Sequence, residues 1–188
     1  MGIRHPEYAR AAGDFYTEPA WTVAALFHHV PLQGVVHDPC CGAGTVVDTA
    51  TEHGLTATGA DIADRSSGRF AVRDFLADET TYSNIVTNPP YRLASPIISH
   101  ALAHVVEGGH VAVLVPLGFL ASQRRYPLFC RPEFTLVLIL SRRPSLPPGE
   151  LLQARGESIR GNGSTDYGWV VWQRNRRPDL ARIQWVPP

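Results

Sequence analysis

Two consecutive prolines interrupt the chain directly after a strand-like run. Residues 83–87 have an extended, largely apolar character, and the tetrapeptide Asn88-Pro89-Pro90-Tyr91 follows them at once. Proline lacks a backbone N–H and cannot continue a helix, and the residue before a proline is pushed toward an extended conformation. We therefore expect a rigid corner just past the carboxyl end of a strand, which is where open α/β sheets bind ligands.

This corner carries groups that suit a flat substrate with an exocyclic NH2 group. The amide oxygen of Asn88 and the carbonyl of Pro89 can accept hydrogen bonds from the two N–H groups of such an amine, and Tyr91 can stack on its ring. Pro-Pro pairs are also common markers of ordinary turns. The tetrapeptide is thus a candidate catalytic corner that includes Pro90, with a plain loop as the alternative.

A glycine-containing turn lies about fifty residues upstream. Residues 35–45 are expected to form a short apolar strand and a tight turn, followed by a helix from Val46 to about Glu52. Gly42 and Gly44 permit backbone conformations or close approaches that a Cβ would block. The spacing is half of a dinucleotide-binding fingerprint, because Val47 stands where the third glycine would be. A strand-to-helix turn without a ligand is the alternative.

Two acidic positions follow at the ends of the next expected strands. Asp61 closes a strand over residues 56–62 and stands 17 positions after Gly44, roughly where nucleoside-binding sites place a ribose-binding acid. A possible third strand over residues 69–76 carries Asp74 and Phe75 near its end. Asp74 is suited to bond an adenine amine and Phe75 to pack on the adenine face. A solvated aspartate beside a core phenylalanine is the plainer interpretation of that pair.

Taken together, residues 38–45 (Asp-Pro-Cys-Cys-Gly-Ala-Gly-Thr) and the later Asn-Pro-Pro-Tyr resemble one known family. This is the S-adenosylmethionine-dependent DNA adenine-N6 methyltransferases, in particular the small phage and prophage type. Residues 14–21 resemble the family's third cofactor segment, although Glu18 interrupts its Thr-Pro pair. Residues 166–172 resemble its last strand. The resemblance covers residues 14 to about 174.

The resemblance implies an α/β, Rossmann-like methyltransferase fold. Its sheet would have seven strands, mostly parallel, with one antiparallel strand near the edge and helices on both faces. We expect a single domain over residues 1–188, with cofactor motifs in 14–75 and the catalytic motif in 83–91. The implied cofactor is S-adenosylmethionine. The positions carried over as cofactor-binding are Tyr16, Thr17, Glu18, Pro19, Asp38, Cys40, Gly42, Gly44, Thr45, Asp61, Ile62, Asp74 and Phe75. Thr17 or Glu18 is also expected to cap the helix that Pro19 opens.

The pattern of the chain supports such a fold independently. Strand-like and helical segments alternate, which is typical of α/β domains. Residues 95–106 predict a helix, and residues 110–116 form a continuous apolar run typical of a strand covered on both faces. Residues 134–140 and 167–172 predict two further strands. A length of 188 residues fits one domain.

Charge is distributed unevenly along the chain. All 17 basic residues are arginines; residues 1–91 hold 5 of them against 11 acids, and residues 92–188 hold 12 against 6 acids. This asymmetry favours a nucleic-acid face beside a cofactor pocket, although a general preference for Arg is the alternative. A short loop at residues 144–165 is a possible substrate-recognition segment. The candidate nucleic-acid contacts are Arg92, Arg124, Arg125, Arg155 and Arg160.

Other site classes find little support. No apolar run approaches the ~20 residues that span a bilayer, and residues 1–7 lack the apolar core of a secretory signal, so we expect a cytoplasmic protein. Three cysteines do not form a disulfide framework. His100 and His104 stand four apart on a predicted helix without an evident third ligand, so we expect no metal site.

DNA is therefore the expected partner, with three alternatives open. The same corner occurs in enzymes that methylate RNA adenine or a protein glutamine amide. A protein of another class, a noncatalytic binding subunit, could retain this fold without the chemistry, and the altered position of Glu18 leaves that alternative open.

Overall fold

The computed structural model describes residues 15–149, 163–175 and 180–187. Its strands are β1 (Val36–Asp38), β2 (Ala57–Asp61), β3 (Ala71–Val72), β4 (Asn84–Thr87), β5 (His110–Pro116), β6 (Phe134–Leu140), β7 (Tyr167–Gln173) and β8 (Arg182–Val186). Its α-helices are α1 (Ala20–His29), α2 (Thr45–Glu52), α3 (Ala94–His104) and α4 (Tyr126–Phe129). Short 3₁₀ turns are η2 (Phe75–Ala77), η3 (Tyr91–Leu93), η4 (Leu117–Leu120) and η5 (Gln123–Arg125).

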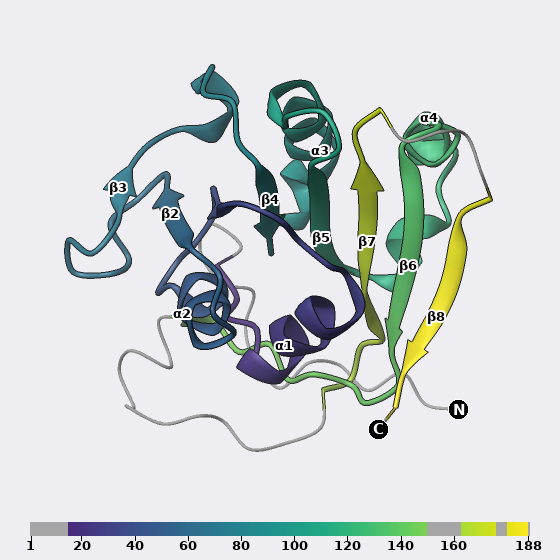
Figure 1. The fold of residues 1–188 in the computed structure, drawn as a ribbon. Helices are drawn as coiled ribbons and strands as arrows, with labels where there is room; N and C mark the ends of the chain where they lie inside the picture. The colour runs from purple at the N-terminus through teal and green to yellow at the C-terminus, as the bar shows by residue number, and fades with distance from the viewer. Residues whose placement is uncertain (1–14, 150–162, 176–179, 188) are drawn as a thin grey trace.

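The strands form one mixed sheet in the order β3-β2-β1-β4-β5-β7-β6-β8 (Figure 1). β7 runs antiparallel to both β5 and β6, and the other neighbouring strands pair in parallel. The mostly parallel sheet and its antiparallel strand confirm the predicted fold class. The predicted number of seven strands is wrong by one, because β8 adds an eighth strand beside β6 and thereby leaves β7 two strands in from the edge.

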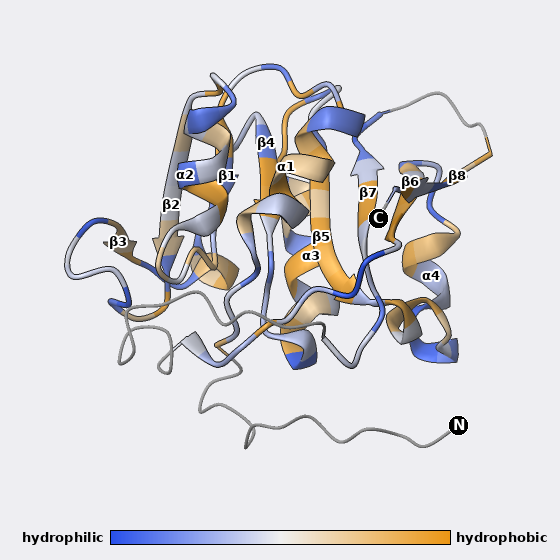
Figure 2. Cartoon of the chain, turned by 90° about the horizontal axis from the view of Figure 1, so that it is seen from below, coloured by the Kyte–Doolittle hydropathy of each residue, from blue (hydrophilic) through white to orange (hydrophobic). Residues whose placement is uncertain are grey.

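Helices cover both faces of the sheet, and successive residues of β5 show why. Val111, Val113 and Val115 pack into one core with α3, while Ala112 and Leu114 pack into the other with α1 and α2. All five of these side chains are fully buried. Because both faces of this strand are covered, neither face requires polar side chains, and its sequence is a continuous apolar run. β5 is correspondingly among the most hydrophobic parts of the sheet (Figure 2).

Several element boundaries differ from those expected. The third strand is limited to Ala71–Val72, and Phe75 instead begins η2, with the Asp74 carboxylate accepting a hydrogen bond from the Leu76 N–H (3.0 Å). The expected cap of α1 is also wrong. Pro19 itself is the N-cap residue, and it has no side-chain cap hydrogen bond. The Thr22 hydroxyl donates to the Pro19 carbonyl (2.8 Å) at this end of the helix.

The parallel pairing of β2, β1, β4 and β5 brings their carboxyl ends to one edge of the sheet. The glycine turn follows β1, Asp61 ends β2, and Asn88 follows β4. These residues are distant in sequence but share one edge because the crossovers are parallel. Within the described parts of the chain, no helix is both long enough and apolar enough to cross a bilayer.

Candidate active site

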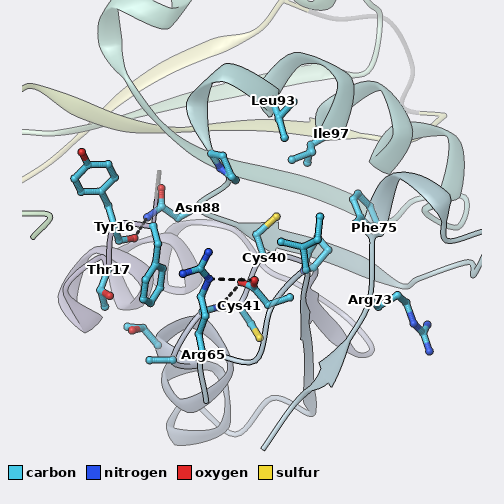
Figure 3. Close-up of a pocket in the computed structure, with 18 of the residues that line it drawn as sticks. Tyr16, Thr17, Cys40, Cys41, Arg65, Arg73, Phe75, Asn88, Leu93 and Ile97 are labelled. Atoms are coloured by element: carbon cyan, nitrogen blue, oxygen red, sulfur yellow. Dashed lines mark hydrogen bonds and ion pairs between the residues drawn. The ribbon is translucent and has the colours of Figure 1, made fainter. Parts of the chain in front are cut away.

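A pocket opens at this edge of the sheet, with about 740 Å³ of empty space including its open mouth. Segments from before α1, after β1, β2 and β3, and after β4 all contribute to its walls (Figure 3). The predicted residues that line it are Tyr16, Thr17, Glu18, Cys40, Gly42, Thr45, Asp61, Ile62, Asp74, Phe75, Asn88 and Pro90. Two groups of residues predicted separately, one for a cofactor and one for chemistry, thus meet in a single cavity.

The glycine turn forms the floor of this pocket through backbone geometry. Gly42 has φ +53° and Gly44, the N-cap of α2, has φ +105°, both in the left-handed region that favours glycine. A Cβ on Gly42 would lie 2.4 Å from the ring of Phe15, so this residue also permits a close approach. The Asp38 carboxylate accepts a hydrogen bond from the Cys40 N–H (3.0 Å), which fixes the start of the turn.

Asp61 ties the turn to the end of β2. Its Oδ2 accepts a hydrogen bond from the Gly42 N–H (2.9 Å), and its Oδ1 accepts from the Ala63 N–H (3.1 Å) and from Arg65 Nε (3.3 Å). Arg65 also lies over the ring of Phe15, 4.4 Å from its centroid. Sequence reasoning missed both Arg65 and Phe15 as pocket residues. The four-residue spacing of Asp61 and Arg65 could not have found the pair, because such a spacing indicates a contact on a helix and this segment is not helical.

Three carboxyl groups, those of Glu18, Asp38 and Asp61, are buried at the site. Burial raises the pKa of Glu18 to about 7. Burial also raises the pKa of Asp38 well above its usual range, and the neighbouring charge of Glu18 adds to this rise. Removal of carboxylates from water disfavours their charged form. A ligand that brings positive charge to this pocket would relieve that cost.

The Asn88 side chain is held on both of its polar ends. Its Nδ2 donates to the Tyr16 carbonyl (3.0 Å) and to Glu18 Oε2 (2.8 Å). Its Oδ1 accepts a hydrogen bond from the Tyr91 hydroxyl (3.2 Å). In Figure 3, Asn88 and Tyr16 lie on one side of the pocket, with Phe75 on the other. The segment before α1 therefore contacts the Asn-Pro-Pro-Tyr corner directly.

Five predicted residues do not line the pocket but lie in its supporting shell: Pro19, Asp38, Gly44, Pro89 and Tyr91. Pro89 is buried beneath the corner. Tyr91 packs against the core, with its ring centroid 6.1 Å from that of Tyr167, and burial raises the pKa of its hydroxyl well above the ordinary value. That hydroxyl therefore remains a neutral donor to Asn88.

The far side of the pocket is a flat apolar wall. Phe75 is buried there, and Leu93 at the end of η3 and Ile97 in α3 face the same space (Figure 3). Asp74 stands at the rim of this wall and is exposed. Leu93 and Ile97 were not predicted, because in sequence they belong to an ordinary apolar helix face.

The predicted nucleic-acid arginines have different surroundings. Arg92 and Arg124 are exposed. Arg125 Nε donates to the Phe119 carbonyl (2.6 Å), and its guanidinium lies 4.2 Å from the centroid of the Phe119 ring. Arg125 is thus engaged with its own chain rather than held out for a phosphate. Arg155 and Arg160, with most of the predicted recognition loop, lie outside the described residues.

Metal chemistry has no cluster to support it in residues 15–149, 163–175 and 180–187: no group of three or more His, Cys, Asp or Glu side chains there is arranged to hold an ion. His100 and His104 instead stack on each other with centroids 4.1 Å apart.

Comparison with known proteins identifies the fold. No family model and no curated protein matches the sequence. Among solved structures, a Pyrococcus horikoshii protein with the provisional name of RNA methyltransferase aligns with TM-score 0.63 and 13% identity, covering 92% of each chain. A Listeria monocytogenes protein, provisionally a class I S-adenosylmethionine-dependent methyltransferase, aligns with TM-score 0.57 and 11% identity over 89% of this chain and 62% of its own. The type IIG restriction endonuclease BpuSI aligns with TM-score 0.58 and 14% identity over 87% of this chain and 25% of its own.

These similarities establish that the chain has the class I S-adenosylmethionine-dependent methyltransferase fold. The chain spans less than two thirds of the Listeria protein and a quarter of BpuSI. Fold alone does not define a substrate, so function must be argued from the site.

Proposed function

We propose that this protein transfers a methyl group from S-adenosylmethionine to the exocyclic amine of adenine in DNA. The observation that carries the proposal is the fixed Asn88 amide at the carboxyl end of β4, on the wall of the pocket that contains the glycine turn and Asp61. The methyltransferase fold of the structural neighbours supports the reaction class.

The pocket fits this cofactor in shape and charge. Asp61 ends β2 at the position suited to ribose hydroxyls, and Gly42 keeps the turn free of a Cβ. Phe75, Leu93 and Ile97 form an apolar wall for a flat base. S-adenosylmethionine supplies an electrophilic methyl group on a positively charged sulfonium, and the buried carboxyl groups suit that charge.

Asn88 would act by orienting the target amine. Its Oδ1 and the Pro89 carbonyl would accept hydrogen bonds from the two N–H groups of the amine, which aims the nitrogen lone pair at the methyl carbon. Acceleration would then come from positioning and preorganised dipoles rather than from a covalent intermediate. An adenine amine within a duplex cannot reach this corner, so the base must be flipped out or single-stranded.

DNA is favoured as the substrate by sequence features that RNA- and protein-modifying relatives do not explain as well. These are the resemblance of residues 14–21 to the third cofactor segment of DNA adenine methyltransferases and of residues 166–172 to their last strand. The arginine excess from residue 92 onward fits either nucleic acid. Arg124 lies in the segment that follows β5, at the same edge of the sheet as Asn88. It provides an exposed cation for a phosphate.

The test is methyl incorporation from radiolabelled S-adenosylmethionine into duplex DNA, single-stranded DNA and RNA, with the modified nucleoside identified by digestion and chromatography. We expect labelled methyladenine in DNA and a loss of roughly 10²- to 10³-fold in rate for Asn88→Ala, typical of removing one preorganised polar group. Asn175→Ala, which removes an exposed amide on the turn after β7, is the control and should leave the rate unchanged.

The outcomes separate the parts of the proposal. Label in RNA or in protein, but not in DNA, would replace the proposed substrate and leave the reaction class in place. An absence of cofactor binding by calorimetry would instead favour a noncatalytic subunit with this fold.

A further inference from the structure

Glu18 is an unusual buried acid. It is only 7% exposed, although it lies in the extended segment before α1 rather than in the core of an element. The two basic side chains that line the same pocket are engaged elsewhere, since Arg65 pairs with Asp61 and Arg73 pairs with Asp78. No ion pair within the described parts of the chain involves Glu18. A buried carboxylate without a cation is costly, which indicates a role beyond stability.

The partner that the structure gives Glu18 is Asn88. The 2.8 Å bond from Asn88 Nδ2 uses one of the two amide N–H groups, and the bond to the Tyr16 carbonyl uses the other. If the amide were flipped, its oxygen would face a carbonyl and a carboxylate, so two donor-acceptor pairs would become two acceptor-acceptor contacts. Glu18 and Tyr16 together thus permit one orientation of Asn88.

In that orientation the Asn88 oxygen remains partly available. An amide oxygen has two lone pairs, and the Tyr91 hydroxyl uses one of them. The second can accept an N–H from a target amine. A flipped amide would instead present N–H groups to that amine, which would repel it.

We propose that Glu18 is a positioning residue for methyl transfer, which through its hydrogen bond to Nδ2 holds the Asn88 amide with its oxygen toward the target amine. This inference rests on the proposed function. It assigns to Glu18 an effect on the rate of transfer, in place of the cofactor-binding role expected from its position in the sequence.

Protonation of Glu18 should weaken this arrangement. The ionised carboxylate can only accept from Asn88, whereas the protonated carboxyl can also donate to the flipped amide oxygen. The titratable groups that interact with the charge of Glu18 are Asp38 at the end of β1 and Tyr91 in η3. With the pKa of Glu18 raised to about 7 by burial, the rate should fall as pH decreases through this range.

The experiment compares Glu18→Ala and Glu18→Gln with the wild type. Cofactor binding is measured by calorimetry with S-adenosylmethionine alone, and transfer is measured as a single-turnover rate on adenine-containing DNA. We expect Glu18→Ala to lower the rate by about 10- to 100-fold, as for loss of a charged hydrogen bond, and to change the cofactor Kd by less than about threefold. Glu18→Gln carries a donor NH2 beside its acceptor oxygen, as the protonated carboxyl does, so its rate should be independent of pH near 7 and close to that of the wild type at low pH.

A second readout does not depend on the substrate. The side-chain N–H resonances of Asn88, assigned by their loss in Asn88→Ala, should titrate in the wild type between pH 5 and 9 and should not titrate in Glu18→Gln. This NMR comparison also decides the matter if Glu18→Ala fails to fold.

Three results would overturn the inference. The first is a wild-type rate for folded Glu18→Ala, and the second is a loss of rate explained entirely by weaker cofactor binding. Asn88 resonances that ignore Glu18 would also overturn it, even if DNA is methylated. Conversely, the Asn88 resonances could titrate with Glu18 in a protein that does not methylate DNA. That result would rule out the proposed substrate and leave the positioning role of Glu18 intact.

Discussion

The two ends of the sheet bury different kinds of side chain. At the β1, β2 and β4 end, the carboxyl edge holds the buried acids Glu18, Asp38 and Asp61 around a pocket. At the β5 to β8 end, the interior is apolar and includes Trp169 and Trp172, both fully buried. Each indole N–H there has a partner, since Trp169 Nε1 donates to the Thr22 carbonyl (2.7 Å) and Trp172 Nε1 to the Leu128 carbonyl (3.0 Å).

This difference indicates that the two ends of the sheet have different roles, a contrast called the division below. The antiparallel end supplies stability through large buried side chains and long strand pairings, while the parallel end holds the buried acids around the pocket. Functional sites commonly retain such locally unfavourable features, which the rest of the fold must offset. The division can be tested by substitutions at each end, because the two ends should respond in different observables.

The largest effect should come from Trp169→Ala. This change removes a fully buried indole and leaves the Thr22 carbonyl without its donor, so we expect a loss of about 4 kcal/mol in the free energy of unfolding, measured by urea denaturation. Trp185→Ala on β8, where the side chain is 60% exposed, is the matched control and should cost less than about 0.5 kcal/mol. Equal losses from the two variants would show that burial of the Trp169 indole does not stabilise this end of the sheet.

Glu18→Gln should increase the free energy of unfolding in the absence of ligand, whereas Trp169→Ala decreases it. The raised pKa of Glu18, about 7 against 4.5, means that the folded protein binds more protons than the unfolded chain between these values, so the stability contributed by this group falls as pH rises through them. The variant should therefore be more stable than the wild type at pH 8, by up to about 3 kcal/mol, and equal to it near pH 4. Urea denaturation at several pH values checks this, with exposed Glu52→Gln as the control. A pH-independent difference would show that the buried charge is not its cause.

Gly42→Ala should combine a moderate loss of stability with a loss of ligand binding. Its φ of +53° is strained for alanine, and the new Cβ would meet the Phe15 ring, so we expect a cost of about 2 kcal/mol and at least tenfold weaker binding of S-adenosylmethionine. Gly54→Ala is the matched control, because its φ is +76° but nothing lies within 4 Å of its added Cβ. Calorimetry should find normal cofactor binding in Gly54→Ala. If both variants bind equally, the contact with Phe15 has no role in shaping the pocket.

Arg124→Ala should have the smallest effect. An exposed arginine that contacts one phosphate should weaken DNA binding by a few-fold and lower the slope of log K against log salt by about 1, with no change in folding stability. Arg182→Ala, on the outer edge strand, is the control. Fluorescence anisotropy over a salt series measures both, and an unchanged slope for Arg124→Ala would remove this residue from the DNA face.

Strand prediction succeeded where local pattern and tertiary environment agree. β5 and β6 occupy the predicted ranges because continuous apolar runs identify strands that are covered on both faces. β8 was not predicted, although Ile183 and Trp185 alternate with the polar Arg182 and Gln184, because this alternation covers only four residues and the pairing with β6 is a long-range contact. The third strand was predicted too long because Phe75 is apolar yet belongs to η2.

Prediction of the candidate site was limited in the same way, because it too relied on local sequence pattern. Gly42, Asp61, Asn88 and Phe75 were predictable because each stands at a characteristic spacing next to a strand end. Arg65, Leu93 and Ile97 were not, because they reach the pocket from segments whose sequence looks like an ordinary turn or helix. The contact between Glu18 and Asn88 could not be predicted for a related reason, since the two residues lie 70 positions apart.

The sequence by itself determined the strand-to-helix turn, the rigid Pro-Pro corner and the burial of β5, because backbone restrictions and hydrophobic runs act over a few residues. Only the tertiary structure decided the eighth strand, the clustering of three buried acids, and the orientation of the Asn88 amide. These depend on segments brought together by the parallel crossovers of the sheet, and a hydrogen bond such as that from Asn88 to Glu18 exists only once both strand ends and the segment before α1 share one edge.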